Sequence, residues 1–272
     1  NITRLANDPL ATRDYQGIIP DNLQVPFPAW DSSCSEAENE QRVDACLAQL
    51  EALMQRYQDE IVGVVLEPLQ GAGGHRIAAP RFYQALSALC HRYQINWGLD
   101  EVQTSGGQCG KVFAIDLFDI PYPPQAVASA KKFGNGVLFM QRSMQDVGVL
   151  DSTWGGTLAD MVRFVQEWRI VSDEQLVAAV ADKTVHLVDG LQRLAAQWPD
   201  KLYNIRGWGL YQGFSLRRPE QKARLLAMAL EDEDLLLLGA GTESIRFRPP
   251  LDVTLPEIDL LLAKLERLFT AL

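Results

Sequence analysis

The sequence predicts an α/β protein with a mainly parallel sheet, followed by a small C-terminal α+β domain. Apolar runs at residues 61–66 and 95–99 are short and apolar on both faces, as in strands buried on both sides. A helical pattern that opens at Pro80 lies between them, so the three segments form one β-α-β unit with a right-handed crossover. Near Pro199 the composition shifts to strand-like runs around glycine turns. We therefore expect a partial large domain over residues 1–198 and a small domain over residues 199–272.

The composition is that of an ordinary globular protein, with 47% hydrophobic and 22% charged residues among 272. A formal net charge of -10 argues against nucleic acid or an anionic membrane as partner. No apolar run reaches membrane-spanning length, and no signal peptide is visible. The four cysteines lack CxxC spacing and the three histidines are scattered, which indicates neither a metal site nor a disulfide framework. We therefore expect a reduced, cytoplasmic protein.

Local signals predict the remaining elements. Residues 1–33 read as an extended surface connection, and Ser35 with Glu38 forms a capping box before an amphipathic helix. A second helical pattern begins near Leu158, and Ser172 with Gln175 is expected to start a further helix that ends near Gln197. Residues 202–216 and 235–247 are expected to form strands, with one helix between them and a last helix after Thr254.

One stretch, residues 95–132, carries the candidate chemistry. The apolar run 95–99 ends in Asp100 and Glu101, and the run 126–130 leads directly into Lys131 and Lys132. Open α/β sheets bind ligands at the edge where the carboxyl ends of parallel strands meet. An acid and a lysine from neighbouring strands can therefore meet there. Pyridoxal phosphate chemistry needs this pair, with the lysine holding the cofactor and the acid facing its pyridine nitrogen.

An apolar run that ends in two acids is also typical of the Walker B strand in P-loop ATPases. That interpretation requires a G-x-x-x-x-G-K-[ST] loop upstream of the acids. The nearest candidate, Gly110-Lys111, lies downstream, is followed by Val112, and has Ser105 where the first glycine is required. The ATPase interpretation therefore fails unless its loop lies in a missing N-terminal part.

Five segments, in this order, resemble the motifs of class III (ω-)aminotransferases, most closely the lysine 6-aminotransferase and 4-aminobutyrate aminotransferase branch. They are Leu66-Glu67-Pro68-Leu69-Gln70-Gly71, Asp100-Glu101-Val102-Gln103-Thr104, Lys131-Lys132, Ser152-Thr153-Trp154-Gly155-Gly156 and Ile245-Arg246-Phe247-Arg248-Pro249-Pro250-Leu251. The resemblance implies a PLP-dependent transferase of fold type I with pyridoxal 5'-phosphate as cofactor. It also implies transfer of an amino group from lysine or another ω-amino donor to a 2-oxo acid such as 2-oxoglutarate.

The same resemblance implies roles for single residues around the cofactor. Lys131 resembles the Schiff-base lysine, with Lys132 as the alternative, and Asp100 resembles the partner of the pyridine nitrogen. Val102 is expected to pack on the ring face, and Gln103 to hydrogen-bond the phenolic oxygen. The separation between Gln103 and Lys131 matches the 4-aminobutyrate branch, in which the first of the paired lysines is the catalytic one.

Two further roles concern the substrate and the second subunit. Arg246 resembles the arginine that receives a substrate carboxylate, and Thr153 resembles a donor to the phosphate of the neighbouring subunit's cofactor. The resemblance thus implies a homodimer with shared active sites. The sequence departs from the family at Ala72, where related branches carry a glutamate that gates the arginine.

A second departure is that no phosphate loop, ring-stacking aromatic residue or further substrate arginine precedes Asn1. The chain is therefore expected to be the C-terminal two-thirds of such an enzyme. The alternative is a truncated, non-catalytic aminotransferase-like domain that acts by association.

Overall fold

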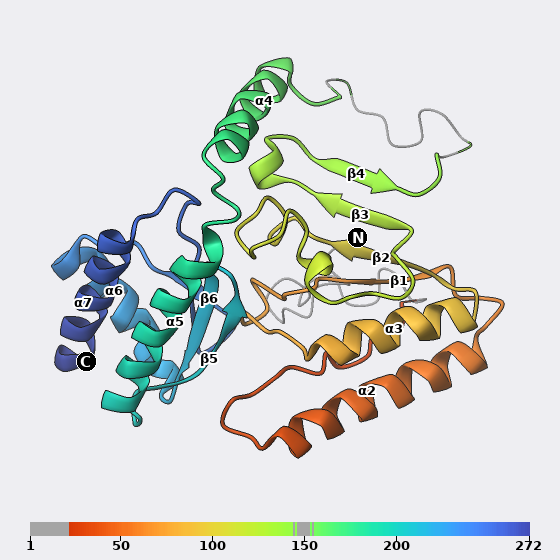
Figure 1. The fold of residues 1–272 in the computed structure, drawn as a ribbon. Coiled ribbons are helices and arrows are strands. Elements are labelled where there is room, and N and C mark those ends of the chain that lie inside the picture. Colours follow the sequence, from red (N-terminus) through yellow and green to blue (C-terminus); the bar gives the residue numbers. More distant parts are fainter. Residues whose placement is uncertain (1–21, 144, 146–152, 154) are drawn as a thin grey trace.

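The structure is a computed structural model that describes residues 22–143, 145, 153 and 155–272. Figure 1 shows two lobes, each built around a four-stranded sheet. The first lobe holds the strands and helices up to β4, and the second holds α5 and all later elements. No helix among the described residues has both the length and the apolar character needed to cross a membrane.

The first sheet has the strand order β1-β2-β3-β4. β1 (Gly63–Leu66), β2 (Asn96–Asp100) and β3 (Ala126–Ser129) are parallel, whereas β4 (Val137–Met140) runs antiparallel to β3. Leu66 pairs with Leu99, and Asp100 pairs with Ala128. This confirms the parallel sheet, and it brings the carboxyl ends of β2 and β3 to one edge. Short 3-10 helices follow β2 and β3, namely η2 (Ala114–Leu117) and η3 (Lys131–Phe133).

Helices α2 (Glu36–Arg56) and α3 (Pro80–Arg92) lie side by side along the first sheet (Figure 1). The predicted capping box is confirmed, because the Glu38 carboxylate accepts from the Ser35 amide at 2.7 Å and the Glu38 amide donates to the Ser35 hydroxyl. The apolar faces of both helices meet the strands in a core that includes Val43, Met54, Phe82, Leu86, Trp97 and Leu99.

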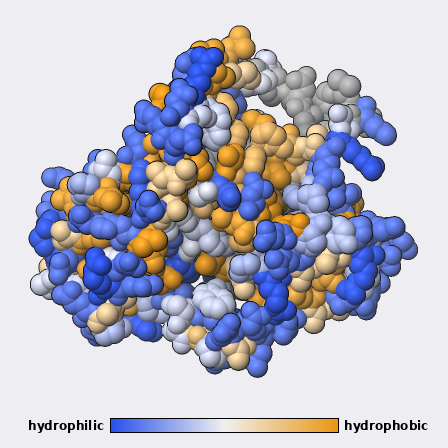
Figure 2. Space-filling model, in the orientation of Figure 1, coloured by the Kyte–Doolittle hydropathy of each residue, from blue (hydrophilic) through white to orange (hydrophobic). Residues whose placement is uncertain are grey.

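The expectation that strand 61–66 is buried on both faces is wrong for the described structure. Val62 is 88% exposed and Val65 is 61% exposed. β1 is an edge strand of its sheet, and none of the described segments covers that face. Apolar side chains are also exposed on β4 and on α4 (Leu158–Asp173), and Figure 2 shows them gathered over this part of the surface.

The helix start expected at Ser172 is also wrong. Ser172 lies in the last turn of α4, and α5 begins later and spans Val180–Gln197. The Gln175 side chain donates to the Ser172 carbonyl at 2.7 Å, and Gln175 itself has a φ of +53°. A residue in that left-handed region interrupts a helix. The two residues therefore close α4 instead of opening α5.

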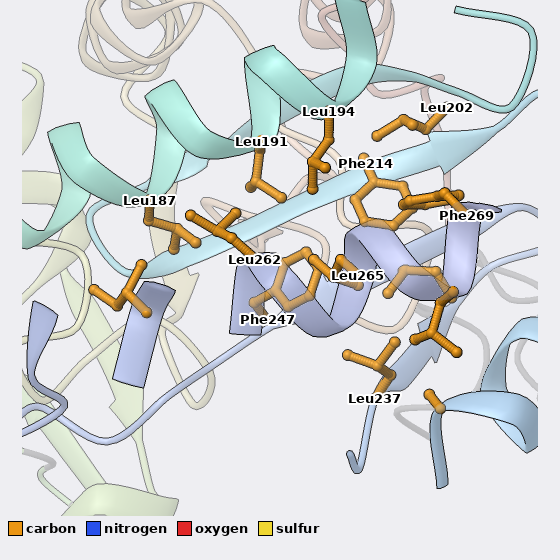
Figure 3. Close-up of a cluster of buried hydrophobic side chains, with 14 of the residues drawn as sticks. Leu187, Leu191, Leu194, Leu202, Phe214, Leu237, Phe247, Leu262, Leu265 and Phe269 are labelled. Atoms are coloured by element: carbon orange, nitrogen blue, oxygen red, sulfur yellow. The ribbon is translucent and has the colours of Figure 1, made fainter. Parts of the chain in front are cut away.

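The second sheet is antiparallel, with the order β5-β6-β8-β7. The expected strands are confirmed as β5 (Leu202–Trp208), β6 (Tyr211–Leu216), β7 (Leu238–Ala240) and β8 (Ser244–Phe247). The expected helices are α6 (Lys222–Glu233), preceded by η4 (Pro219–Gln221), and α7 (Leu255–Ala271). The helix α5 lies before residue 199 and still packs into the core of this lobe (Figure 3). The domain boundary expected at residue 199 stays a prediction.

The packing of α7 gives a stability prediction. Leu265 is fully buried against α5 and the second sheet, whereas Leu260 on the same helix is 53% exposed. Leu265→Ala should lower the free energy of unfolding by about 2–5 kcal/mol, through lost burial and the cavity that remains. Leu260→Ala should change it by less than about 0.5 kcal/mol. Equal losses in a urea titration of the two variants would contradict the position of this core.

Candidate active site

The site begins at the edge where β2 and β3 end. Asp100 is the last residue of β2, is half-buried, and accepts a hydrogen bond from the Val102 amide at 3.0 Å. Lys131 lies three residues beyond Ala128, the β3 partner of Asp100, and its side chain is exposed. Lys131 also has a φ of +52°, which is uncommon for a residue with a side chain and frequent at functional sites. The sheet thus brings the predicted acid and lysine to one edge.

The second acid, Glu101, points away from the site and into the core. It is fully buried and accepts from the amides of Ala114 at 2.7 Å and Ile115 at 3.0 Å, and from the Thr104 hydroxyl at 2.9 Å. Its own amide donates to the carbonyl of Ala128 at 2.8 Å. Burial raises the pKa of Glu101, and these three hydrogen bonds act against that rise. Glu101 therefore fixes the loop between β2 and η2, which carries Val102 and Gln103.

A third carboxyl group, Glu67, follows β1 at the same edge. Burial, reinforced by the Asp100 carboxylate, raises the pKa of Glu67 to about 7, while Arg246 and Lys131 act in the opposite direction. Two acids and two bases therefore share one electrostatic neighbourhood. The sequence placed Glu67 in a motif but indicated no role for it. Like Asp100, Glu67 stands at the carboxyl end of a strand, and this position could have marked it as a candidate site residue.

Arg246 lies on β8 and reaches the loop after β2. Its Nη1 donates to Gln103 Oε1 at 3.1 Å and lies 3.3 Å from the Tyr211 hydroxyl, which itself donates to Gln103 Oε1 at 2.9 Å. Within the described residues, Arg246 forms no ion pair with a carboxylate. Ala72, at the position of the gating acid in related branches, is exposed. The arginine is therefore held by two uncharged oxygen atoms.

A close approach of the backbone completes this group. A Cβ atom at Gly71 would lie 2.5 Å from the Tyr211 hydroxyl, 2.8 Å from Gln103 Oε1 and 3.0 Å from Arg246 Nη1. Any side chain at this position would displace the three groups, so the loop after β1 needs a glycine there. The sequence alone could not show which glycine of this loop is the critical one.

Arg206 ties the same loop to the second sheet. Its guanidinium is buried and donates to the carbonyls of His75 and Gly74, both at 2.6 Å, and to the Ser244 hydroxyl at 2.7 Å. Burial lowers the pKa of Arg206 to about 10, which leaves it charged at neutral pH. The sequence gave no signal for this role, because an arginine within an alternating strand is usually exposed.

The remaining predicted residues lie around this group. Val102 is half-buried. Lys132 is half-buried and packs against Gly106, and burial together with Arg248 lowers its pKa. Thr153 is exposed and is not among the contacts of Gln103 or Arg246, while Ser152 and Trp154 of its motif lie outside the described residues. In the described part of the chain, no group of three or more His, Cys, Asp or Glu side chains could hold a metal ion.

Comparison with known proteins identifies the family of the chain. Residues 10–269 match the family model "Aminotransferase class-III". The chain is a class III aminotransferase family member. Curated relatives include the L-lysine-epsilon aminotransferase of Amycolatopsis lactamdurans, which is 33% identical over 264 residues, covering 93% of this chain and 57% of the relative. The 4-aminobutyrate aminotransferase of Emericella nidulans is 29% identical over 92% of this chain and 51% of the relative.

Solved structures show the same relationship. The lysine aminotransferase from M. tuberculosis has a TM-score of 0.91 and 29% identity, and the match covers 98% of this chain and 62% of that one. The class III family, the resemblance to the lysine and 4-aminobutyrate branch, and the fold type I architecture are thereby confirmed. The chain spans about half the length of the curated relatives that it matches.

Enzymes of this family use pyridoxal phosphate, and the residues present fit the ring of that cofactor. Asp100 supplies a carboxylate at the end of one strand, Lys131 an exposed amine after the next, and Gln103 an amide beside them. The absence of a side chain at Gly71 lets Gln103, Tyr211 and Arg246 pack directly against the loop after β1. The donor set is therefore the one that a pyridine ring with an aldehyde and a phenolic oxygen needs.

The raised pKa of Glu67 predicts how stability depends on pH. A carboxyl group with a folded pKa of about 7 and an ordinary value of 4.5 is harder to ionise in the folded state. The contribution of Glu67 to the free energy of unfolding is therefore fully present below pH 4.5 and is lost as the pH rises through 7. Between pH 4.5 and pH 7 and above, the free energy of unfolding of the cofactor-free wild type should fall by on the order of 1–3 kcal/mol relative to that of Glu67→Gln.

Chemical denaturation at several pH values measures this difference. The exposed Glu60, replaced by Gln, serves as the matched control and should give a constant offset from the wild type. A constant offset for Glu67→Gln as well would show that Glu67 ionises normally.

Proposed function

We propose that the protein is a pyridoxal phosphate-dependent aminotransferase that moves an amino group from lysine or another ω-amino donor to a 2-oxo acid such as 2-oxoglutarate. The observation that supports the proposal most is the meeting of Asp100, Lys131, Gln103 and Arg246 where the two sheets approach each other. Membership in the class III family supports the same activity.

The residues at the sheet edge would hold the cofactor and move the proton. When bound, pyridoxal phosphate supplies a ring that withdraws electrons from the carbon bearing the amino group. Asp100 would keep the ring nitrogen protonated, because an adjacent carboxylate favours the charged form. Lys131 would hold the cofactor through its amine and then act as general base and acid at Nζ. Val102 would pack on the ring face, and Gln103 would donate its amide to the phenolic oxygen.

The arginine would orient the substrate. A guanidinium can bind a carboxylate through two parallel hydrogen bonds, which fixes direction as well as position. Arg246 is half-buried beside the loop that carries Gln103, so a carboxylate bound there would turn the adjacent amino or oxo carbon towards Asp100 and Lys131. This geometry supports both a 2-oxo acid acceptor and an amino acid donor.

We also propose that the protein works as a homodimer in which Thr153 serves the partner's cofactor phosphate. Large apolar side chains are exposed on β1, β4 and α4, among them Val65, Leu138 and Val162. Exposed apolar areas of this kind mark interaction surfaces. A cytoplasmic location stays a prediction, and it agrees with the finding that all four cysteines are free.

The activity is tested by adding pyridoxal phosphate to the purified protein and recording its absorbance spectrum. An enzyme should give a bound-cofactor band and, after borohydride reduction, carry the cofactor covalently on a lysine, whereas a non-catalytic domain should give only the spectrum of the free aldehyde and stay unlabelled. Transamination between lysine and 2-oxoglutarate, followed by glutamate formation, then tests the substrates. A protein that stays unlabelled after reduction, with no glutamate formed, would favour the non-catalytic alternative.

The proposed function predicts different behaviour for the two lysines. Lys131→Ala should abolish the borohydride-reducible adduct, whereas Lys132→Ala should retain it. Lys131 lies within the charged neighbourhood of Glu67, while the charged neighbours of Lys132 are Arg248, Glu167 and Asp252. Mass spectrometry of the reduced protein identifies the modified lysine. Loss of the adduct in Lys132→Ala alone would move the assignment by one residue.

The proposed function also predicts the effect of a carboxylate at position 72. Arg246 meets no carboxylate in the described structure, so an incoming carboxylate has no ion pair to displace. Ala72→Glu should add such a competitor and should shift donor preference several-fold towards ω-amines such as lysine or 4-aminobutyrate. Steady-state kcat/KM for an ω-amine donor and for an α-amino donor measures the ratio. Ala72→Gln is the uncharged control, and an equal shift in it would exclude the charge argument.

A further inference from the structure

Tyr211 contacts Gln103 and Arg246, although neither its residue type nor its place in a strand indicated this. It lies on β6, is 1% exposed, and its hydroxyl reaches the loop after β2. The rings of His75 and Tyr211 pack edge to face with centroids 4.6 Å apart, and the Arg248 guanidinium lies 5.5 Å from the Tyr211 ring centre. The buried phenol ring is therefore held by two neighbouring side chains, and its hydroxyl has a fixed position.

That hydroxyl and the Gln103 carbonyl together hold one nitrogen of Arg246. Nη1 is 3.1 Å from Gln103 Oε1 and 3.3 Å from the Tyr211 oxygen, and the tyrosine donates its own proton to Gln103 at 2.9 Å. The three groups close a triangle of hydrogen bonds in which only the arginine is charged. Gly71 packs against all three, which leaves them little freedom to separate.

The other guanidinium nitrogens are not used in this way. In the described part of the chain Nη2 forms no hydrogen bond, and Nε is buried without a partner. A buried donor without a partner costs about 1–3 kcal/mol, so the guanidinium retains a demand for an acceptor. Nη2 remains open to bind a substrate carboxylate while Nη1 stays held. The carboxylate then displaces no anion and need not order the arginine.

We propose that Tyr211 is a positioning residue for Arg246. With Gln103 it forms an uncharged clamp that stands in place of the absent gating carboxylate and presents the guanidinium to a substrate carboxylate. The inference rests on the proposed function, in which Arg246 receives that carboxylate. It adds a specificity determinant, because a permanently presented arginine favours substrates with a carboxylate at this end over substrates with an amine there.

The test measures binding without chemistry. Glutarate carries two carboxylates but no amino or oxo group, so its affinity for the cofactor-loaded protein is measured by calorimetry. Tyr211→Phe keeps the ring against His75 and removes only the hydroxyl. It should weaken glutarate binding about 3–10-fold, the range that one lost hydrogen bond gives. Tyr203→Phe is the matched control and should leave the affinity unchanged. Tyr203 lies on β5 of the same sheet, and its hydroxyl donates a hydrogen bond to Glu243.

A double-mutant cycle separates positioning from general damage to the fold. In the Arg246→Lys background, Tyr211→Phe should cause no further loss of glutarate affinity, because the clamped group is gone. The same loss in both backgrounds, or no loss in either, would overturn the inference. If wild type itself does not bind glutarate, the carboxylate role of Arg246 fails and the inference fails with it. The cofactor adduct on Lys131 tests the proposed activity independently of these outcomes.

Discussion

A buried carboxylate, that of Glu101, is the interaction on which the site depends. Removing an ionised carboxylate from water is very costly unless the group is well hydrogen-bonded. Here two amides at the start of η2 and the Thr104 hydroxyl supply the donors, while the Glu101 amide bonds to β3. The loop between β2 and η2 is thereby closed on itself and attached to the sheet. Its outer side then presents Asp100 and Gln103 in a fixed arrangement.

The second lobe meets this loop with arginines that have uncharged partners. Arg206 bonds to carbonyls and serine hydroxyls, Arg246 to Gln103 and Tyr211, and Arg248 to Gln108 Oε1 at 2.7 Å. Each neutral acceptor offsets part of the cost of burial without cancelling the charge. The positive potential that remains favours anionic ligands at the junction of the lobes. The chain has a net charge of -10, so the attraction for carboxylates is a local property of these residues.

Local sequence patterns predicted some features of the structure correctly and others wrongly, and each outcome has a physical reason. The capping box at Ser35 follows from atoms three residues apart, and it is present. The pair Ser172 and Gln175 has the same spacing and closes a helix instead, because the backbone at Gln175 turns left-handed. The exposure of Val65 depends on what lies across the face of β1, and no pattern within the strand reports that.

The amino-acid order was sufficient to predict the alternation of helices and strands and to reveal the family motifs. It also predicted that the acid and the lysine stand at neighbouring strand ends, because strand pairing brings such ends together whatever the details of packing. It was not sufficient for the contacts between the lobes. Gln103 and Arg246 are 143 residues apart, and the clamp by Tyr211, the anchor at Arg206 and the raised pKa of Glu67 all arise from atoms that meet only after both sheets have formed. Those interactions fall off within a few ångströms, so they depend on three-dimensional distance and not on spacing along the chain.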